Sequence, residues 1–476
     1  MCRNFVTKAP RVVYANYLDG KARQSFASEL QSLAQLLHAG NNVDLEELSS
    51  RVSDLIGQCQ TKKDYIKVID LVLACYAQEF KLDIGQAETR AYEKALKKRV
   101  FRKIIPKVYE EHSRQPVDER KILFLNKRKG LTPSLQCSYI FDRLETDPRY
   151  DTGIHSLFLG KVPVSETCFN AIQFVKDFAT AKALFLYAGD WGILSHVEVR
   201  DESKVIQLWH GCGVFKKLDF SLRPKHKRSK VKFPRHTNYT CVAVPSLEQK
   251  WVFEEFMNIS KDSDIIQPLG ISYTDVYFDE DYRKRAYEKL YSAIPEAREK
   301  KVILYAPTYR GKLLKRRIPD RLDIDVLAQD LKDDYILIIK HHRTGEGKQK
   351  IPKEHRDSFA YDFTRSHKAG MEINEFMMVA DIMITDYSSV AFEYALLERP
   401  LIFFAYDLDE YLDERGLYYE FDEITPGPIV TTNSEIVDYI KSIELGFDAD
   451  KIVNFKKKYL SACDGQSTER VLKLLE

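Results

Sequence analysis

Hydrophobic and polar positions divide the chain into two parts with different periods. Between residues 22 and 112, apolar side chains recur at intervals of three and four, as in Leu30, Leu33, Leu36, Leu37, Tyr65, Val68, Ile69 and Val72. This spacing places them on one face of a helix. We therefore expect a helical region over residues 1–115 that docks onto a membrane or a partner protein.

The last part of this region, residues 91–110, is basic and partly amphipathic. Its apolar residues include Leu96, Val100, Ile104 and Val108, and lysines and arginines lie between them. Two interpretations stay open for it. The segment is either a helix with an ordinary solvated face or a helix that lies on a membrane surface.

From about residue 118, short β-rich runs alternate with helical stretches. The first series has strands at Ile122–Leu125, Ala183–Tyr187, Val205–Leu208 and Cys241–Val244. The second series has strands at Val302–Tyr305, Tyr335–Ile339, Asp381–Thr385 and Leu401–Phe404, with helices at Glu372–Val379 and Ser389–Leu397. Such alternation is typical of parallel sheets with crossover helices. We predict an α/β fold with two Rossmann-like domains, residues 116–275 and 276–476, and a hinge at Pro268-Leu269-Gly270 and the polar stretch 271–282.

Composition excludes several classes of protein. The 476 residues are 44% hydrophobic and 30% charged, which is typical of globular proteins and allows two or three domains. No apolar run approaches the roughly 18 residues that span a bilayer, and the N-terminus lacks the apolar core of a secretory signal. The eight cysteines form no C-x-x-C pair. We therefore expect a reducing cytoplasm, without a zinc site or a disulfide framework.

The net charge of +2 hides an asymmetry between the two halves of the chain. Residues 1–250 carry 41 Lys and Arg against 28 Asp and Glu, whereas residues 251–476 carry 32 against 43. A basic half suits an anionic partner such as a phosphorylated polymer, a membrane surface or nucleic acid. No recognised nucleic-acid-binding module occurs, so nucleic acid is the least favoured of these partners.

Residues that directly follow the strands are the first candidates for chemistry, because ligands of open α/β sheets bind beyond the carboxyl ends of strands. The first such end reads Leu208-Trp209-His210-Gly211. A glycine lets a ligand approach the backbone, and histidine titrates near neutral pH, as a general base requires. A structural histidine remains the alternative.

Two further strand ends carry cationic groups. Thr308 and Arg310 follow Val302–Tyr305, and Lys340, His341, His342 and Arg343 follow Tyr335–Ile339. Arginine binds phosphate at two points, although a surface salt bridge would explain Arg310 equally. A metal site on the two histidines is disfavoured, because neighbouring residues of an extended chain point to opposite sides.

The fourth strand end runs through Thr385, Asp386, Tyr387, Ser388 and Ser389 into a helix. Free N–H groups at a helix start favour an anion, but serine and aspartate are also ordinary helix caps. The D-x-D pairs at 323–325 and 407–409 are weak metal signals, and we predict no metal site. The four ends together supply chemistry for a diphosphate and an attacking hydroxyl.

Four runs carry a resemblance to a known family: QLWHG (207–211), YAPTYRG (305–311), IIKHHR (338–343) and ADIMITDYSSVAFEYALLERPLIFFAYDLDEY (380–411). They resemble the CDP-glycerol:poly(glycerophosphate) glycerophosphotransferase family, which builds teichoic acids and related capsule polymers in bacteria. GLYYEFDEITPGPIV (416–430) also matches. The likeness covers about residues 203–430 and is weaker back to residue 120.

The resemblance implies a GT-B fold, in which two Rossmann-like domains surround a cleft. It also implies transfer of glycerol phosphate, or ribitol phosphate, from a CDP-linked donor to a hydroxyl of a lipid-linked or growing polymer. His210 would be the general base, and His342 and Arg310 would contact the donor diphosphate. The remaining donor-side residues that it implies are Thr308, Lys340, Thr385, Asp386, Ser388, Ser389 and Glu393, the last of them for a ribose or polyol hydroxyl. It names no cofactor besides the donor, CDP-glycerol or CDP-ribitol, and it does not establish a metal requirement.

Two departures from the family pattern bear on the substrate subclass. The family often has W-H-G-T-P-L-K where this chain has WHGCGVFK (209–216), and Arg343 replaces a proline. These differences affect the choice between glycerol and ribitol, or between priming and polymerising.

A basic stretch from Lys216 to Arg235 follows His210 and would bind the polymer or anionic lipid. Its candidate residues are Lys216, Lys217, Lys225, Lys227, Arg228 and Lys230. A solvated loop is the alternative. Because this stretch is basic and would contact anionic lipid, we expect a cytoplasmic enzyme at the inner face of the plasma membrane. Two other functions stay open: a GT-B glycosyltransferase that uses a UDP- or CMP-sugar, and a non-catalytic scaffold that binds membrane or polymer.

Overall fold

The structure is a computed structural model of the chain. It describes residues 28, 29, 32, 51, 55, 97–98, 100–126, 133–157, 164–189, 192–222, 236–311, 316–342, 346–347, 349–365 and 370–476. Most of the helical region predicted over residues 1–115 lies outside this set. Its described end is helical, with a π-helical turn η1 (Val100–Ile104) that continues into α6 (Ile105–His112).

The chain divides into two compact units. Unit 1 contains residues Met1–Gln207 and Val231–Thr240, and unit 2 contains Leu208–Lys230 and Cys241–Glu476. Each unit is described by itself. The domain boundaries drawn from the sequence stay a prediction.

Unit 1 is built on parallel strands in the order β2-β1-β3-β4. These are β1 (Asp118–Asn126), β2 (Asp151–Ser156), β3 (Ala181–Leu186) and β4 (Lys204–Gln207). Its longer helices are α7 (Leu135–Glu145) and α8 (Val164–Phe178), and a 3-10 turn η2 covers Leu194–His196. Phe124 of β1 stacks on Phe185 of β3 with ring centroids 5.1 Å apart, so aromatic side chains form part of the core.

Unit 2 contains a second parallel sheet in the order β12-β11-β10-β7-β8-β9. Its strands are β7 (Lys301–Tyr305), β8 (Tyr335–Ile339), β9 (Ala360–Asp362), β10 (Ile382–Thr385), β11 (Leu401–Phe404) and β12 (Ile429–Val430). The strands β8, β10 and β11 are buried along their whole length and consist mainly of isoleucine, leucine and phenylalanine. Such continuous apolar runs are typical of parallel strands covered on both faces.

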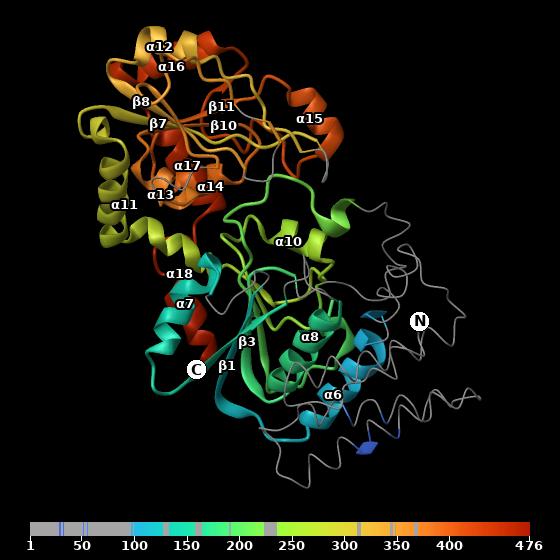
Figure 1. The fold of residues 1–476 in the computed structure, drawn as a ribbon. Coiled ribbons are helices and arrows are strands. Elements are labelled where there is room, and N and C mark those ends of the chain that lie inside the picture. Colours follow the sequence, from blue (N-terminus) through green and yellow to red (C-terminus); the bar gives the residue numbers. More distant parts are fainter. Residues whose placement is uncertain are drawn as a thin grey trace, which may run out of the picture. The chain divides into compact units, whose positions relative to one another are not determined.

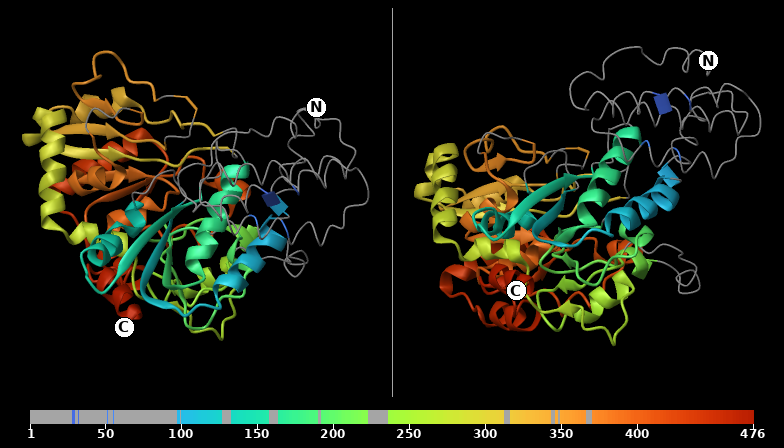
Figure 2. Two further views of the ribbon diagram at one scale, coloured as in Figure 1. Left: turned by 60° about the horizontal axis from the view of Figure 1, so that its bottom comes forward. Right: turned by 90° about the horizontal axis from the view of Figure 1, so that it is seen from below.

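Helices lie on both faces of this second sheet (Figure 1). One face is covered by α12 (Ile324–Leu331) and α16 (Asn433–Leu445), whose apolar residues join the strands in one buried cluster. The other face carries α13 (Ile373–Val379), α14 (Val390–Ala395) and α17 (Asp450–Tyr459). Figure 2 shows the strands of this sheet side by side from other directions.

Unit 2 also contains shorter elements outside this sheet. β5 (Cys241–Ala243) and β6 (Ile266–Gln267) pair in parallel and are linked by α10 (Lys250–Met257). The remaining elements are η3 (Asp219–Leu222), η4 (Ser272–Phe278), α11 (Glu280–Ala293), η5 (Pro295–Arg298), α15 (Leu408–Arg415), α18 (Ser467–Leu472) and η7 (Lys473–Leu475).

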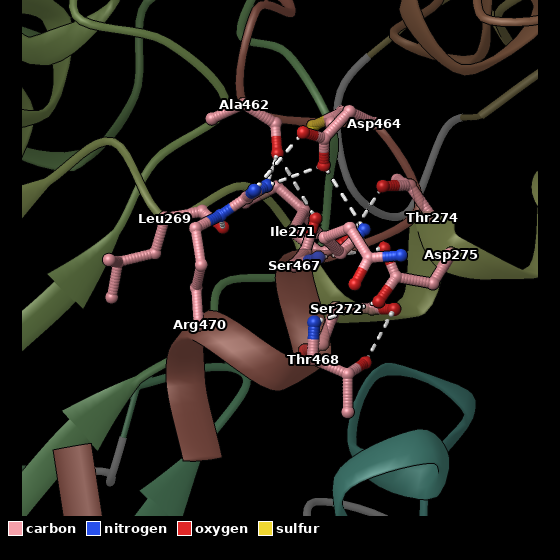
Figure 3. A network of polar contacts seen from close by, with 12 residues as sticks. Leu269, Ile271, Ser272, Thr274, Asp275, Ala462, Asp464, Ser467, Thr468 and Arg470 are labelled. Carbon is pink, nitrogen blue, oxygen red and sulfur yellow. Dashed lines mark hydrogen bonds and ion pairs between the residues drawn. The ribbon is translucent and has the colours of Figure 1, made fainter. Parts of the chain in front are cut away.

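A polar network ties the segment after β6 to the C-terminal helix (Figure 3). The carboxylate of Asp275 accepts the backbone N–H groups of Ser467 and Thr468 at 3.1 and 2.7 Å, at the start of α18. Arg470 donates to the carbonyl of Leu269 at 2.9 Å. Gly270 has φ +82°, and a Cβ there would lie 2.1 Å from the carbonyl oxygen of Ala462. Residues 269–275, where the sequence suggested a hinge, are thus fixed to the C-terminal segment.

The predicted fold class is confirmed, since both units are parallel-sheet α/β structures of the Rossmann type. All eight strands expected from the sequence occur, with ends that differ by a few residues. The sequence missed β2, β6, β9 and β12, which lie at sheet edges or are only two or three residues long. Among the predicted helices, 389–397 is shorter than expected, because α14 covers only Val390–Ala395.

Candidate functional site

The turn before His210 is strained. Trp209 is buried and has φ 60°, a conformation that a bulky aromatic residue seldom adopts. Its ring lies against the imidazole of His210 at 4.2 Å between centroids and against Phe256 at 4.9 Å. His210 itself is exposed. Packing of the indole therefore holds the strained turn and presents the histidine to solvent.

The loop after His210 packs directly on α14. A Cβ on Gly213 would lie 2.2 Å from the ring of Phe392, so only glycine allows this approach. Phe215 meets the same ring edge-on at 5.0 Å. The Sγ atom of Cys212 lies 3.6 Å from that of Cys463. The candidate base and the helix that begins after Ser389 therefore share one packed support.

Glu393 lies inside this support and not at its surface. Its carboxylate accepts a hydrogen bond from the hydroxyl of Tyr273, and the side chain is buried. Burial raises the pKa of Glu393 to about 7, although the hydrogen bond from Tyr273 and the backbone of Cys212 lower it. The resemblance implied contact with a ribose or polyol hydroxyl, but the structure gives this carboxylate an internal partner.

Arg310 forms ion pairs with two aspartates. Its Nε and Nη2 atoms donate to Asp407 Oδ2 and Oδ1 at 2.6 and 2.9 Å, and Nη1 donates to Asp386 Oδ2 at 2.8 Å. The carbonyl of Thr308 and the hydroxyl of Tyr406 accept the remaining N–H groups at 2.6 and 3.4 Å. All five N–H groups thus have acceptors. Burial opposes the charge, but Asp407 and Asp386 offset it and raise the pKa of Arg310 above its ordinary value.

Asp386 joins the ends of two strands. Its Oδ1 accepts the backbone N–H groups of Thr308 and Tyr387 at 2.7 and 2.6 Å. The hydroxyl of Thr385 donates to the carbonyl of Ala306 at 2.8 Å, and both Thr385 and Asp386 are buried. The resemblance assigned these two residues to the diphosphate. Their contacts within the protein order the backbone between the ends of β7 and β10, and the assignment to the diphosphate stays a prediction.

Three side chains at strand ends remain candidates for ligand contact. Ser388 and Ser389 are half-buried at the start of α14, and the hydroxyl of Ser389 makes no capping hydrogen bond. The hydroxyl oxygen of Thr308 is buried without a hydrogen-bond partner among the described residues. Hydroxyl groups placed in this way can donate to phosphate oxygens.

The end of β8 separates its two histidines. His341 is buried against the ring of Tyr305 at 5.5 Å, and burial lowers its pKa to about 4. His342 meets the ring of Tyr309 at 5.4 Å, and its pKa is lowered by burial, Arg316 and Lys216. The ammonium of Lys340 donates to the carbonyl of Phe363 at 2.9 Å. The two imidazoles have different surroundings, as expected for neighbours in an extended chain. Arg343 lies outside the described residues.

One acidic cluster has ligand atoms close enough for a metal ion. It consists of Asp325, Glu354 and His355, whose ligand atoms lie within 4.8 Å of one another. His355 is ion-paired with Asp325 at 3.0 Å, and both carboxylates are exposed. Asp325 lies in the first turn of α12, and Glu354 and His355 precede β9, so none of the three belongs to the strand ends described above.

The basic stretch divides into residues with different environments. Lys217 is exposed, whereas Lys216 is half-buried with its ammonium 5.6 Å from the ring centroid of Tyr411. Burial lowers the pKa of Lys216 to about 8. Lys225, Lys227, Arg228 and Lys230 lie outside the described residues.

Exposed apolar side chains gather near this stretch, which the sequence did not predict. Leu222, Leu247 and Trp251 are 58, 67 and 37% exposed. The hydroxyl of Tyr418 donates to Ser221 at 2.7 Å, and the Tyr418 ring lies 5.8 Å from that of Trp251, so these elements are neighbours. In the described ranges, none of the helices has the length and apolar character needed to cross a bilayer.

Sequence comparison gives a consistent group of similar proteins. The family model described as CDP-Glycerol:Poly(glycerophosphate) glycerophosphotransferase matches residues 107–476. The teichoic acid poly(ribitol-phosphate) polymerase of Bacillus spizizenii is 33% identical over 361 residues, which are 75% of this chain and 56% of that protein. The teichoic acid ribitol-phosphate primase of the same species is 31% identical over 75% of this chain and 90% of the primase.

A solved structure of the wall teichoic acid polymerase TagF, from a variant soaked with CDPG, superimposes with a TM-score of 0.60 at 21% identity. The match covers 82% of this chain and 98% of that one, and it supports the fold. This chain spans about half the length of the Bacillus spizizenii polymerase and 64% of the Staphylococcus aureus ribitol-phosphate polymerase TarK.

Proposed function

The chain belongs to the CDP-glycerol:poly(glycerophosphate) glycerophosphotransferase family, and from this we propose that it transfers a polyol phosphate from a CDP-linked donor to a hydroxyl of an anionic polymer. The donor is CDP-ribitol or CDP-glycerol. The acceptor is a lipid-linked primer or a growing chain of a teichoic acid or a related capsule polymer.

The observation that carries this proposal is the packing of the His210 loop on α14. Gly213 lies against Phe392, and α14 begins directly after Ser388 and Ser389. One packed support therefore holds a solvent-exposed imidazole and two hydroxyl groups at a helix start. General-base catalysis and phosphate binding need these groups in a fixed relation, because misplacement by about 1 Å can cost roughly 100-fold in rate.

In the reaction, His210 takes the proton of the acceptor hydroxyl. The acceptor oxygen forms a bond to the phosphorus that carries the polyol, and the bond from that phosphorus to the oxygen bridging it to CMP breaks. The products are the polymer, longer by one polyol phosphate, and CMP, while the proton passes from His210 to solvent. Negative charge shifts onto the bridging oxygen during this step and must be stabilised there.

The residues of the site have two different tasks in this proposal. Ser388, Ser389 and the hydroxyl of Thr308 donate hydrogen bonds to the diphosphate, and His342 lies beside it. Arg310, Asp386, Thr385 and Glu393 act as positioning residues, because their polar groups bind each other or neighbouring residues of the chain. Positioning of this kind supports preorganised donors without direct contact with the substrate.

Membrane association is part of the same proposal. The exposed Leu222, Leu247 and Trp251 offer an apolar surface, and the sequence continues from Leu222 into a run with seven Lys and Arg and no acidic residue (223–235). Apolar side chains beside basic ones suit a bilayer with anionic headgroups. The enzyme would then act as a peripheral protein at the cytoplasmic face of the plasma membrane, where a lipid-linked acceptor is presented.

The test is release of CMP from a panel of donors in the presence of a lipid-linked polyol-phosphate acceptor. The panel contains CDP-ribitol, CDP-glycerol, UDP-sugars and CMP-sugars. CDP-ribitol is the first donor to try, since the polymerase and primase compared above are named for ribitol phosphate. We expect turnover with one CDP-polyol and a loss of at least 100-fold in His210→Ala, whereas His355→Ala should keep full activity.

The other outcomes point to the alternative functions. Turnover with UDP- or CMP-sugars alone would replace this proposal with a glycosyltransferase. Binding to polymer or vesicles without any turnover, and without an effect of His210→Ala, would indicate a scaffold.

A further inference from the structure

The side chain of Lys216 points inward, unlike that of its neighbour Lys217. Residues 215–217 pair with residues 416–418: the N–H of Lys217 donates to the carbonyl of Gly416 at 3.1 Å, and the N–H of Tyr418 donates to that of Phe215 at 3.2 Å. Lys216 bridges to Leu417 in this pairing. Alternate residues of an extended segment face opposite sides, so Lys217 is exposed while Lys216 turns toward Tyr411.

Among the described residues, the ammonium of Lys216 has no anionic partner. Within the part of the chain that the structure describes, no hydrogen bond or ion pair uses it, and its contact is the ring face of Tyr411. A half-buried ammonium has lost part of its hydration, which is unfavourable without a compensating acceptor. Burial is accordingly the main cause that lowers its pKa to about 8.

The carboxylate of Asp386 does not supply that acceptor. Asp386 raises the pKa of Lys216 from a distance, but its oxygens bind Arg310, Thr308 and Tyr387. Aromatic rings bring further cationic or titratable groups to the same place. Arg310 Cζ lies 5.5 Å from the centroid of the Tyr411 ring that Lys216 contacts, and Arg415 and His342 lie 5.8 and 5.4 Å from the centroid of the Tyr309 ring. Arg415 and Arg310 both lower the pKa of Lys216, and Lys216 in turn lowers that of His342.

This cluster of side chains therefore carries a surplus of positive charge. Two carboxylates, Asp386 and Asp407, surround Arg310, and Lys216 and Arg415 remain without a carboxylate partner among the described residues. Arg415 donates to the carbonyl of Gly311 at 3.0 Å. Separate elements, namely the loop after His210, the end of β8 and the end of α15, bring these cations together. Such convergence is costly unless an anion binds there.

We propose that Lys216, Arg415 and His342 form a binding site for the diphosphate of a nucleotide, with Lys216 as the contact to the phosphate that departs with CMP. The sequence had placed Lys216 with the polymer- and membrane-binding lysines, and the inward direction of its side chain separates it from them. The identity of the nucleotide rests on the function proposed above, but the recognition of a diphosphate rests on this cluster of side chains alone.

The cluster has a consequence for pH. A bound diphosphate stabilises the protonated ammonium, so binding takes up a proton wherever free Lys216 is neutral. Affinity should then fall about tenfold per pH unit above pH 8. The other groups that face Lys216 do not hide this signal. Guanidinium groups such as those of Arg310 and Arg415 keep their charge in proteins, and Asp386 is ion-paired with Arg310. Burial raises the pKa of Tyr411 further above this range, and burial lowers the pKa of His342 below its ordinary 6.5, so this imidazole is neutral there.

The experiment measures binding of CMP, CDP and inorganic diphosphate to the full chain by calorimetry. In Lys216→Gln we expect about 10- to 100-fold weaker binding of CDP and diphosphate, as for loss of one charge-assisted hydrogen bond. Lys216→Arg should retain most of the affinity and lose the decline above pH 8. Lys217→Gln is the matched control and should bind as the wild type does. Thermal unfolding of each variant checks that the fold is intact.

Two results would overturn the inference. One is a folded Lys216→Gln protein that binds CDP and diphosphate with wild-type affinity. The other is a wild-type protein that binds none of the three probes. A wild type that binds CDP through Lys216 but transfers no polyol phosphate would remove the proposed function and leave this site in place.

Discussion

Arg310 and Asp407 form a two-point ion pair, with Nε 2.6 Å from Oδ2 and Nη2 2.9 Å from Oδ1. The pair lies between β7 and α15, and Asp386 completes it from the end of β10. The contact therefore joins segments almost 100 residues apart. It fixes the strand ends that carry Thr308 and Ser388, which makes it a structural part of the candidate site.

Loss of Asp407 should destabilise the fold. Asp407→Asn removes the charge that balances a guanidinium with little exposure, and breaking a buried pair typically costs about 3–5 kcal/mol. Urea unfolding of the full chain measures this change. Asp330→Asn is the control, since Asp330 pairs with Lys441 at the surface, where such pairs contribute roughly 0–1 kcal/mol. Equal effects of the two substitutions would contradict a structural role for the Arg310 pair.

Glu393 should make stability depend on pH. Its folded-state pKa is about 7, above the ordinary 4.5, because of burial. Between these values the unfolded chain releases the proton while the folded chain keeps it, so the wild type loses stability as pH rises from about 4.5 to 7. The loss is about 3 kcal/mol for a shift of this size. Above pH 7 both states are ionised and the contribution stays constant.

The measurement compares wild type with Glu393→Gln by chemical denaturation at several values between pH 5 and 8. Glutamine cannot ionise, so the difference between the two proteins isolates this residue from all other titrating groups. We expect the wild type to become less stable relative to the variant as pH rises to 7. A difference that does not change with pH would show that Glu393 titrates normally in the folded protein.

Much of the site could be predicted from the sequence because it depends on short-range order. Long apolar runs such as Tyr335–Ile339 mark buried strands, and ligand-binding residues follow the ends of parallel strands. This rule was enough to select His210, Thr308, His342 and Ser388. The short edge strands β9 and β12 carry too few residues for any period to be recognised.

The partners of charged residues could not be predicted in the same way. The position of Arg310 after a strand and the resemblance led to its assignment to phosphate, which stays a prediction. Its ion pair with Asp407 could not be foreseen, because the two positions lie far apart in the sequence. Lys216 was grouped with Lys217 because the two are adjacent in a basic run, and the pairing with residues 416–418 that turns them apart is equally distant. Trp209 carries no sequence signal for its positive φ. Such features arise from tertiary packing, which local patterns do not encode.

Gly213 should tolerate no side chain. In Gly213→Ala the new Cβ would lie 2.2 Å from the ring of Phe392, so either the loop or α14 must move. Overpacking of this kind costs about 1–3 kcal/mol, and it would shift His210 relative to Ser388. We expect lower stability and a fall in turnover that exceeds any change in donor affinity.

Gly189→Ala is the control for this substitution, because a Cβ there meets no atom within 4 Å. Thermal unfolding and CMP release are measured on both proteins. Wild-type stability and turnover in Gly213→Ala would show that the loop and α14 are not held together by this contact.

The exposed apolar residues near Trp251 should control binding to anionic membranes. Leu222→Ser together with Leu247→Ser removes two side chains that are 58 and 67% exposed, so the folded core should not change. Full burial of a leucine side chain contributes about 1.5–3 kcal/mol. Even if the two leucines insert into the membrane only partly, their removal should weaken vesicle binding at least tenfold. Co-sedimentation with phosphatidylglycerol-containing vesicles measures this, and binding should weaken with salt because basic residues contribute.

Leu445→Ser is the matched control, since Leu445 is 93% exposed at the end of α16. Equal losses in the control and the double variant, or equal binding to vesicles of phosphatidylcholine alone, would contradict a specific membrane-binding surface at Leu222, Leu247 and Trp251.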